Sequence, residues 1–264
     1  MDFGPMDFKG MRLDSNTFDT KVTVRGQAET MLKESQWAHN FASAHFGDAK
    51  GDFGAQQRFI GMMVSLLAQM QGQYAMETLM GQDGLYRDSD GTLDYTGNWV
   101  MLHVLSDIAG LTGEKDGRYI NPQMHSIFDG AATNLFRALE KRQPESARES
   151  AAAIRALVYR ASTTGDTGVR TAALARARAI ADSKLVGFRS EDVVENAAAI
   201  AGLISTAAAG PDPGKYRAAA DTHFQTLAAD FDPAGGVFKS KKVYKGDDIA
   251  WIIGGLNSLV QQGN

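Results

Sequence analysis

The sequence contains no cysteine in its 264 residues. This absence excludes disulfide bridges, thiolate nucleophiles, cysteine-ligated zinc, iron–sulfur clusters and c-type haem attachment. A chain without thiols is compatible with an oxidising compartment. The composition therefore slightly favours an extracytoplasmic location, secreted or periplasmic, over a cytoplasmic one.

Excess basic charge and long apolar runs are also missing. The chain has 27 Lys and Arg against 31 Asp and Glu, which gives a formal net charge of −4. Because no positive excess is available to neutralise phosphates, we expect no nucleic-acid partner. The longest apolar stretch, residues 59–68, is far shorter than the roughly 20 residues that span a bilayer. We therefore expect no membrane insertion.

Recognised cofactor and metal motifs are absent. The sequence has no Walker loop, no G-x-G-x-x-G and no G-x-S-x-G elbow, and its five histidines show no metal-ligand spacing. We therefore predict no cofactor and no metal. Residues 88–94 alternate acids with a glycine as a calcium loop does, but Tyr86 occupies the first ligand position of an EF-hand. A tight polar turn is the preferred interpretation, and a calcium site of another class stays open.

What the sequence does contain is helical periodicity. Only six prolines interrupt it, and apolar residues recur three and four positions apart, which predicts an all-α fold. Residues 1–22 lack this period and are predicted to form an irregular arm before a single domain at 23–264. The predicted helices span residues 24–46, 55–80, 98–111, 120–141, 147–162, 169–182, 192–209, 215–230 and 248–261.

Two kinds of helix alternate along the chain. Those at 98–111, 147–162 and 192–209 are apolar or small nearly all round, which predicts burial on every side. The helices that follow them carry one apolar stripe and one polar face. This alternation is typical of helical hairpins with an inner and an outer layer. The helix at 55–80 is an exception, since it is more apolar than an outer helix should be.

Short glycine turns repeat between the two kinds of helix. The turns at 113–118, 165–170 and 210–215 each lead from a buried helix into a half-exposed one. They recur every 47 to 52 residues, counting from Arg118 to Arg170 to Arg217. A period of this length that contains one helix pair is the mark of a helical repeat array.

The tail GGVF…Y.GDD.A..IGGLNSL at residues 235–259, with the turns TGEKDGRY and TTGDTGVR, resembles the α/α-toroid superfamily of six-hairpin glycosidase-like folds. The resemblance implies inner helices wrapped by outer ones. It also implies a site at the long-loop end, where the inner helices begin. Nine helices fall short of the twelve in a complete six-hairpin ring, so we expect an open or incomplete toroid.

The residues at that end define the candidate site. A glycosidase needs two carboxyl groups about 5 to 9.5 Å apart, and acids near the starts of inner helices could supply them. The candidate catalytic residues are Asp94, Glu195, Asp247 and Asp248. Aromatic and polar neighbours on the same segments offer contacts to a sugar ring. The candidate ligand-binding residues are Tyr95, Asn98, Trp99, His103 and Tyr244.

Each of these residues also has a structural interpretation. Acids are favoured at helix N-termini as caps, and repeated aromatic residues fill the core between hairpins. His103 lies in an apolar helix, where a hydrogen-bonded core histidine is common. Two hypotheses for the function therefore stay open. One is a carbohydrate-active pocket enzyme with a saccharide or other small-molecule ligand. The other is a non-catalytic helical-repeat scaffold or binding subunit of the cell envelope, with a protein partner.

Overall fold

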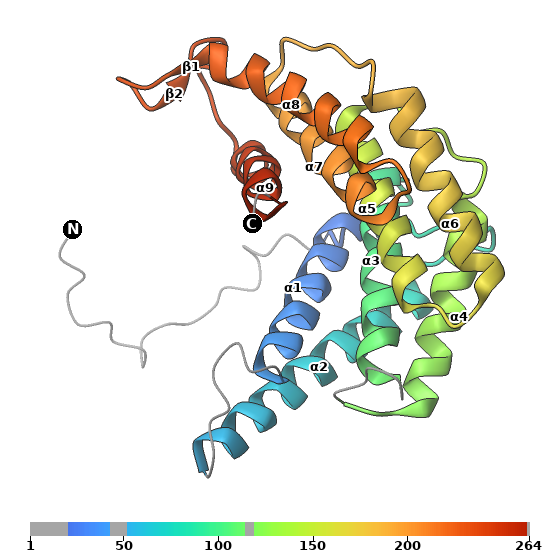
Figure 1. Cartoon of the computed structure of the whole chain (residues 1–264). Helices are drawn as coiled ribbons and strands as arrows, with labels where there is room; N and C mark the ends of the chain where they lie inside the picture. The colour runs from blue at the N-terminus through green and yellow to red at the C-terminus, as the bar shows by residue number, and fades with distance from the viewer. Residues whose placement is uncertain (1–20, 43–51, 114–118, 263–264) are drawn as a thin grey trace.

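A computed structural model of the chain describes residues 21–42, 52–113 and 119–262 (Figure 1). The first twenty residues of the predicted arm lie outside these ranges. Within them the chain forms nine α-helices, which confirms the all-α prediction. The helices are α1 (Val24–Ala42), α2 (Asp52–Thr78), α3 (Tyr95–Thr112), α4 (Pro122–Leu139), α5 (Ala147–Thr163), α6 (Thr167–Ile180), α7 (Val193–Ala209), α8 (Pro213–Asp230) and α9 (Gly246–Gln262).

The helices pack in a regular order. Each odd-numbered helix packs against the next, from α1 through α3, α5 and α7 to α9. The even-numbered helices α2, α4, α6 and α8 each pack against the odd-numbered helix that precedes them in the chain. In Figure 1 the odd-numbered helices follow a curved path with α1 and α9 at its two ends. No extensive packing joins α1 to α9 in the described part of the chain, so the path is open on one side.

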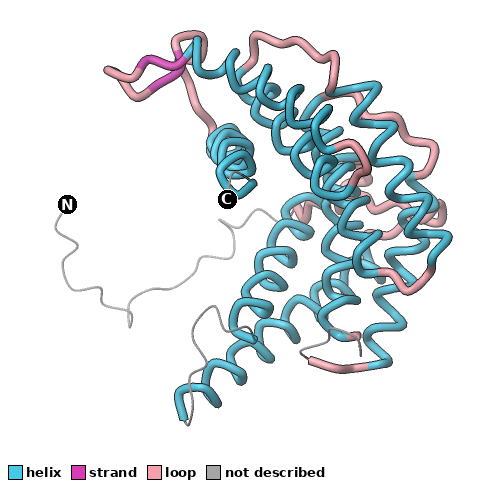
Figure 2. The backbone as a smooth tube through the Cα atoms, viewed as in Figure 1, coloured by secondary structure: helices cyan, strands magenta, loops and turns pink. Residues whose placement is uncertain are grey.

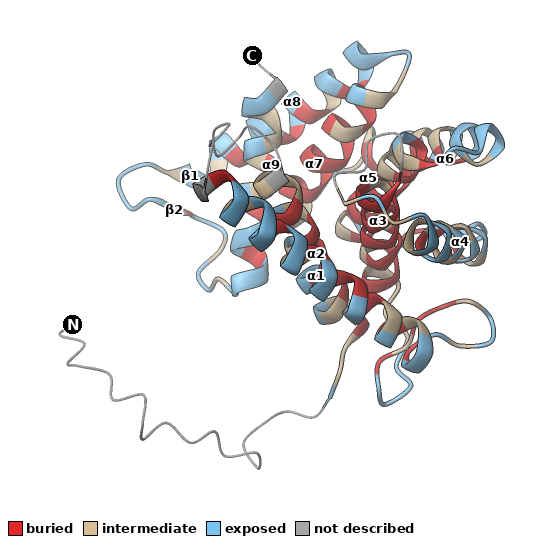
Figure 3. Cartoon of the chain, turned by 90° about the horizontal axis from the view of Figure 1, so that it is seen from below, coloured by how far each residue is buried: buried red, intermediate tan, exposed pale blue. Residues whose placement is uncertain are grey.

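The core lies along this path. Helices α3, α5 and α7 are buried on almost every side, as predicted, whereas α4, α6 and α8 bury one stripe (Figure 3). Small residues permit the close approach of neighbouring helices. A Cβ at Gly255 of α9 would lie only 2.3 Å from the carbonyl oxygen of Ala197 on α7. Any larger residue at Gly255 would therefore push α9 off α7.

The first turns of α3, α5 and α7 repeat one hydrogen-bond pattern. In each, the side chain four residues after the N-cap donates to the N-cap carbonyl oxygen, which ties the first turn together. The donors are Asn98 to Asp94 (2.8 Å), Ser150 to Ser146 (2.8 Å) and Asn196 to Asp192 (3.0 Å). The starts of these three helices therefore share one local hydrogen-bond pattern.

Two features were not predicted from the sequence. A π-helical turn, Ala181–Leu185, continues α6, where a plain helix end is predicted at residue 182. An antiparallel hairpin of two short strands, β1 (Phe231–Asp232) and β2 (Val237–Phe238), separates α8 from α9 (Figure 2). Tyr244 accepts a hydrogen bond from the backbone N–H of Phe238 at 2.9 Å, which fastens this hairpin to the segment before α9.

Candidate functional site

The predicted catalytic carboxylate Asp94 lies at the N-cap position of α3 but forms no side-chain cap bond there. It accepts instead from the guanidinium of Arg25 on α1, with Arg25 Nε 2.9 Å from Asp94 Oδ2. The pair joins the starts of two odd-numbered helices. The capping interpretation therefore does not account for this acid.

Glu195 and Asp247 share one cation. Glu195 on α7 accepts from the backbone N–H of Ala147 at 2.7 Å and from Arg148 Nε at 2.6 Å. Arg148 also places Nη1 3.8 Å from Asp247 Oδ2 at the start of α9. The structure therefore brings two predicted catalytic acids, from α7 and α9, to the same guanidinium. Glu195 at the same time satisfies the N-terminus of α5.

Asp248 behaves as a helix-terminal residue. Its Oδ2 accepts from the backbone N–H of Lys245 at 3.0 Å and lies 3.1 Å from Lys241 Nζ. These bonds hold the pKa of the Asp248 carboxyl below its ordinary value. The reach from the third helical residue back to the N-cap N–H is one half of a capping box, so the structural interpretation fits Asp248 well.

Two of the predicted ligand-binding residues are fully buried. The side-chain amide of Asn98 forms two hydrogen bonds with the backbone of Tyr86. It accepts from the N–H and donates to the carbonyl oxygen, each at 2.8 Å. Trp99 is fully buried in the core. Neither side chain presents a surface to a ligand in this structure.

The two predicted ligand-binding tyrosines are half-buried and contact neighbouring side chains. The guanidinium carbon of Arg142 lies 3.9 Å from the ring centroid of Tyr95, a close cation–π contact. Tyr244 is held by its bond to the hairpin strand β2. These contacts favour the structural interpretation of both rings.

The acidic turn at 88–94 is closed by a lysine. Lys21 Nζ lies 2.8 Å from Asp90 Oδ2 and 3.5 Å from Asp88 Oδ2. Asp88 also accepts from the backbone N–H of Val24 at 2.8 Å and so caps α1, while Gly91 takes a positive φ of 85°. These contacts support the tight polar turn, because the ammonium group of Lys21 lies where a calcium ion would have to neutralise Asp88 and Asp90.

His103 lines a hollow of about 280 Å³ between α1, α3 and α5. Its ring lies 4.6 Å from that of Tyr159, centroid to centroid, at an interplanar angle of 44°. Burial, assisted by the positive charge of Arg155, lowers the pKa of His103 to about 4, so the imidazole is neutral at neutral pH. The other residues that line the hollow are Gln36, His39, Asn40, Asp107 and Tyr159.

Asp107 joins three helices at the wall of this hollow, one turn after His103 on α3. Its side chain is 2% exposed. Oδ1 lies 3.0 Å from Nε2 of His39 and accepts from the hydroxyl of Tyr159, and Oδ2 accepts from the hydroxyl of Ser35. Burial alone would raise the pKa of Asp107, but the bonds from His39, Ser35 and Tyr159 hold it below its ordinary value. Asp107 is therefore an ionised carboxylate held by donors from α1 and α5.

We call Ser35, His39, Asp107 and Tyr159 the Asp107 cluster. Sequence reasoning missed it, although one signal was present. An aspartate inside the nearly all-apolar segment 98–111 must be buried, and a buried carboxylate needs partners. The partners themselves lie 52 to 72 residues away along the chain, so no local motif identifies them.

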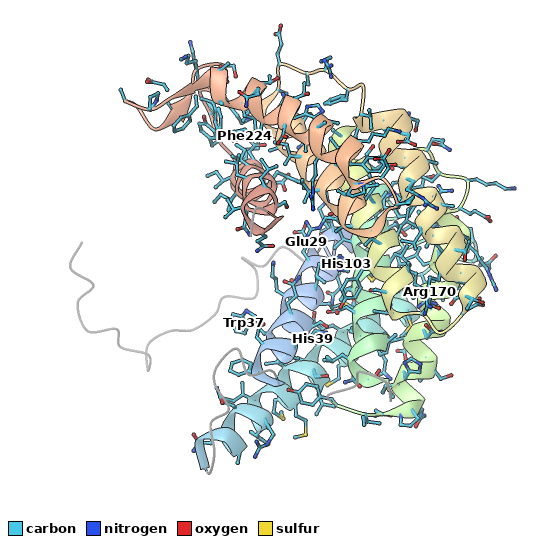
Figure 4. The ribbon with its side chains drawn as sticks, viewed as in Figure 1. Glu29, Trp37, His39, His103, Arg170 and Phe224 are labelled. Carbon is cyan, nitrogen blue, oxygen red and sulfur yellow. The ribbon has the colours of Figure 1, made fainter. Side chains whose placement is uncertain are left out.

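Glu29 is a further acid that sequence reasoning missed. It lies on α1 (Figure 4), and its side chain is exposed. Partial burial raises the pKa of Glu29, Arg25 opposes this shift, and the negative charges of Asp247 and Asp94 add to it. Glu29 therefore keeps its proton to a higher pH than an isolated glutamate does.

A second hollow, of about 300 Å³, lies beside α7 and α8 and is lined partly by Asn196 and His223. The ring nitrogens of His223 lie 2.8 Å from Asn196 Oδ1 and 3.3 Å from the carbonyl oxygen of Leu185. Burial lowers the pKa of His223. Both neighbours are acceptors, so a neutral His223 donates its single N–H to one of them. The buried ring is the hydrogen-bonded core histidine that sequence reasoning expected at His103.

Comparisons with protein-family models, with curated proteins and with solved structures found no significant match. Across the residues that the structure describes, no group of three or more histidine and acidic side chains is arranged to hold a metal ion. No helix in the same ranges is long and apolar enough to cross a membrane.

Proposed function

We propose that the chain is a carbohydrate-active pocket enzyme built as an open α/α toroid, and that its site is the hollow beside the Asp107 cluster. The observation that carries the proposal is the bond between buried Asp107 and His39 at the wall of a hollow that His103 and Tyr159 also line. A buried ionised carboxylate paired with a histidine is the arrangement that orients a general base.

The pair assigns a role to each ring nitrogen of His39. With Nε2 donating to Asp107, Nδ1 is the nitrogen that takes a proton from a ligand hydroxyl and returns it. His103 is neutral at pH 7 and accepts or donates a hydrogen bond without carrying charge. A hollow with this many donors and acceptors suits a ligand rich in hydroxyls, and about 280 Å³ lies near the lower end of ligand pockets.

The predicted carboxylates form the second part of the proposal. Asp94 Oδ2 lies 2.9 Å from Arg25 Nε, and Asp247 Oδ2 lies 3.8 Å from Arg148 Nη1. Glu29, an exposed residue near the same helix starts, has a raised pKa. Asp94 and Asp247 lie at the starts of α3 and α9, whereas the hollow lies near the C-terminal ends of α1, α3 and α5. Asp94 is about 20 Å from Asp107 along α3, so these acids would hold only a distant part of an extended saccharide.

The experiment is turnover on a panel of oligosaccharides by the parent protein and by His39→Gln. The matched control is His223→Gln, which alters the histidine of the other hollow. We expect His39→Gln to lose at least about 100-fold in rate with an unchanged circular dichroism spectrum, and His223→Gln to retain turnover. Equal rates in the parent and His39→Gln would overturn the assigned role.

A scaffold without catalysis is the second candidate, and one observation favours it. The Asp107 cluster joins α1, α3 and α5, so these bonds also serve as a purely structural tie between hairpins. Failure of the parent protein to bind or turn over any glycan on the panel would leave this scaffold function in place of the enzyme.

A further inference from the structure

Helix α2 exposes a continuous apolar face. Residues 59–76 contain no charged side chain, and the helix packs mainly against α1. Eight large apolar side chains on it are 40% to 65% exposed. They are Phe59, Ile60, Met62, Met63, Leu66, Leu67, Met70 and Tyr74. We call this set the α2 face.

The middle of the α2 face has the spacing of a coiled-coil seam. Ile60, Met63, Leu67, Met70 and Tyr74 follow one another at intervals of three, four, three and four residues. This is the a and d pattern with which one helix packs along another of similar direction. All five are exposed, so the seam has no partner within the described part of the chain.

We infer that the α2 face binds the α2 face of a second copy of this chain, in a two-fold symmetric dimer. Two identical uncharged faces meet without like-charge repulsion, and a two-fold axis brings the same surface of each copy together. Methionine and aromatic side chains, which make up five of the eight residues, are enriched at such interfaces.

The size of the face fits this occupant. Covering the eight side chains would bury roughly 700 Å² on each copy, close to the roughly 800 Å² per partner of a standard interface. The helix is about 40 Å long at 1.5 Å per residue, which gives the seam room for its five contacts.

A membrane surface fits the α2 face less well. Helices that lie in a bilayer interface carry lysine and arginine on the polar face, and residues 59–76 hold neither. The dimer goes beyond the proposed enzyme and does not rest on it, because the α2 face and the Asp107 cluster use different residues.

The first test is sedimentation velocity of the full chain over a range of micromolar concentrations. We expect a concentration-dependent dimer in the parent. In Ile60→Glu/Met70→Glu we expect self-association weaker by on the order of 100-fold or more, since four carboxylates would be buried unpaired. The matched control is Ile253→Glu/Val260→Glu, which alters two apolar residues of α9 that are 62% and 68% exposed.

A second test does not depend on disruption. Because the chain has no cysteine, a single Leu67→Cys at the centre of the seam gives one crosslinking site per copy. We expect a covalent dimer with a short bismaleimide, and none from Ile253→Cys. Crosslinking through Ile60→Cys as well indicates parallel helices, whereas crosslinking only near residue 67 indicates antiparallel ones.

Three results would overturn the inference. One is a parent protein that is monomeric at every concentration with no crosslink at residue 67. Another is a dimer that the α2 substitutions leave intact or that the α9 substitutions dissociate. The third is a monomeric parent that dimerises only after removal of residues 1–20, which would assign the α2 face to the chain's own N-terminal segment.

Discussion

The Asp107 cluster and the α2 face reverse the usual distribution of polar and apolar groups. Asp107 is 2% exposed and ionised, while Met70, on the helix that packs against α1, is 65% exposed. Single exposed apolar residues are ordinary, but a buried charge and a continuous exposed apolar face are not. The two regions differ in their partners. Asp107 has its hydrogen-bond donors within the chain, whereas the apolar side chains of the α2 face are exposed in the described structure.

This difference separates two kinds of stability. Removing Asp107 should damage the isolated chain, because the buried hydroxyl of Ser35 and the half-buried donors of His39 and Tyr159 would lose their acceptor. Removing a side chain of the α2 face should damage only the assembly.

Asp107→Ala should have the largest effect. It leaves the donors of Ser35, His39 and Tyr159 without their acceptor, which should lower the free energy of unfolding by about 3 kcal/mol. Urea denaturation at neutral pH measures the loss. The control is Asp166→Ala, the exposed N-cap of α6, which should cost about 1 kcal/mol. Equal losses in the two variants would show that the cluster is no more than a surface contact.

The titration of His103, which lies beside the Asp107 cluster, should make the free energy of unfolding depend on pH. Its folded pKa of about 4 lies below the ordinary 6.5, so between these values the unfolded chain binds the proton more readily. Stability is therefore fully present above about pH 6.5 and falls as the pH drops toward 4. Allowing for partial exposure of the ring, we expect about 2 kcal/mol to be lost by about pH 4.5.

The measurement is urea denaturation of the parent and of His103→Gln at neutral pH and near pH 4.5. His103→Gln should show a smaller loss between the two conditions, because Gln does not titrate. The same loss in both proteins would mean that other groups cause the pH dependence.

Glu195→Ala should have an intermediate effect. Glu195 satisfies the backbone N–H of Ala147 at the start of α5 and pairs with Arg148, so its removal should cost about 1.5 kcal/mol. Asp247→Ala is the control, because that side chain is 47% exposed and should cost no more than about 0.5 kcal/mol. Loss of turnover in Asp247→Ala with unchanged stability would assign the acid to chemistry rather than to capping.

The sequence predicts those parts of the fold that depend on near neighbours. The glycine turns at 165–170 and 210–215, the buried helices 98–111 and 192–209 and the acids at helix starts are local patterns, and the structure has them close to the predicted positions. All but the first residue of the predicted turn at 113–118 lie outside the described residues. The irregular arm at 1–22 stays a prediction, because all but its last two residues lie outside the described ranges.

The Asp107 cluster was harder to predict because its residues are distant in the sequence. His103 was singled out from its apolar neighbours and does line a hollow, but Ser35, His39 and Tyr159 come from two other helices. Asn98 and Trp99 show the opposite error. Their residue types suit a ligand, but only the packing of α3 determines that both are fully buried. The unusual apolarity of residues 55–80 was recognised from the sequence, and its exposure was not.

Met70→Gln should have the smallest effect on the isolated chain and is the sharpest contrast with Asp107→Ala. In dilute protein it should change the free energy of unfolding by less than about 0.5 kcal/mol, because the side chain contacts mainly solvent. In concentrated protein the parent should gain stability from dimerisation, so that its thermal midpoint rises with concentration, and Met70→Gln should lose most of that rise. Thermal unfolding over a range of concentrations measures both effects. A large loss in dilute Met70→Gln would show that the α2 face is completed within one chain, and the contrast between the two regions would then fail.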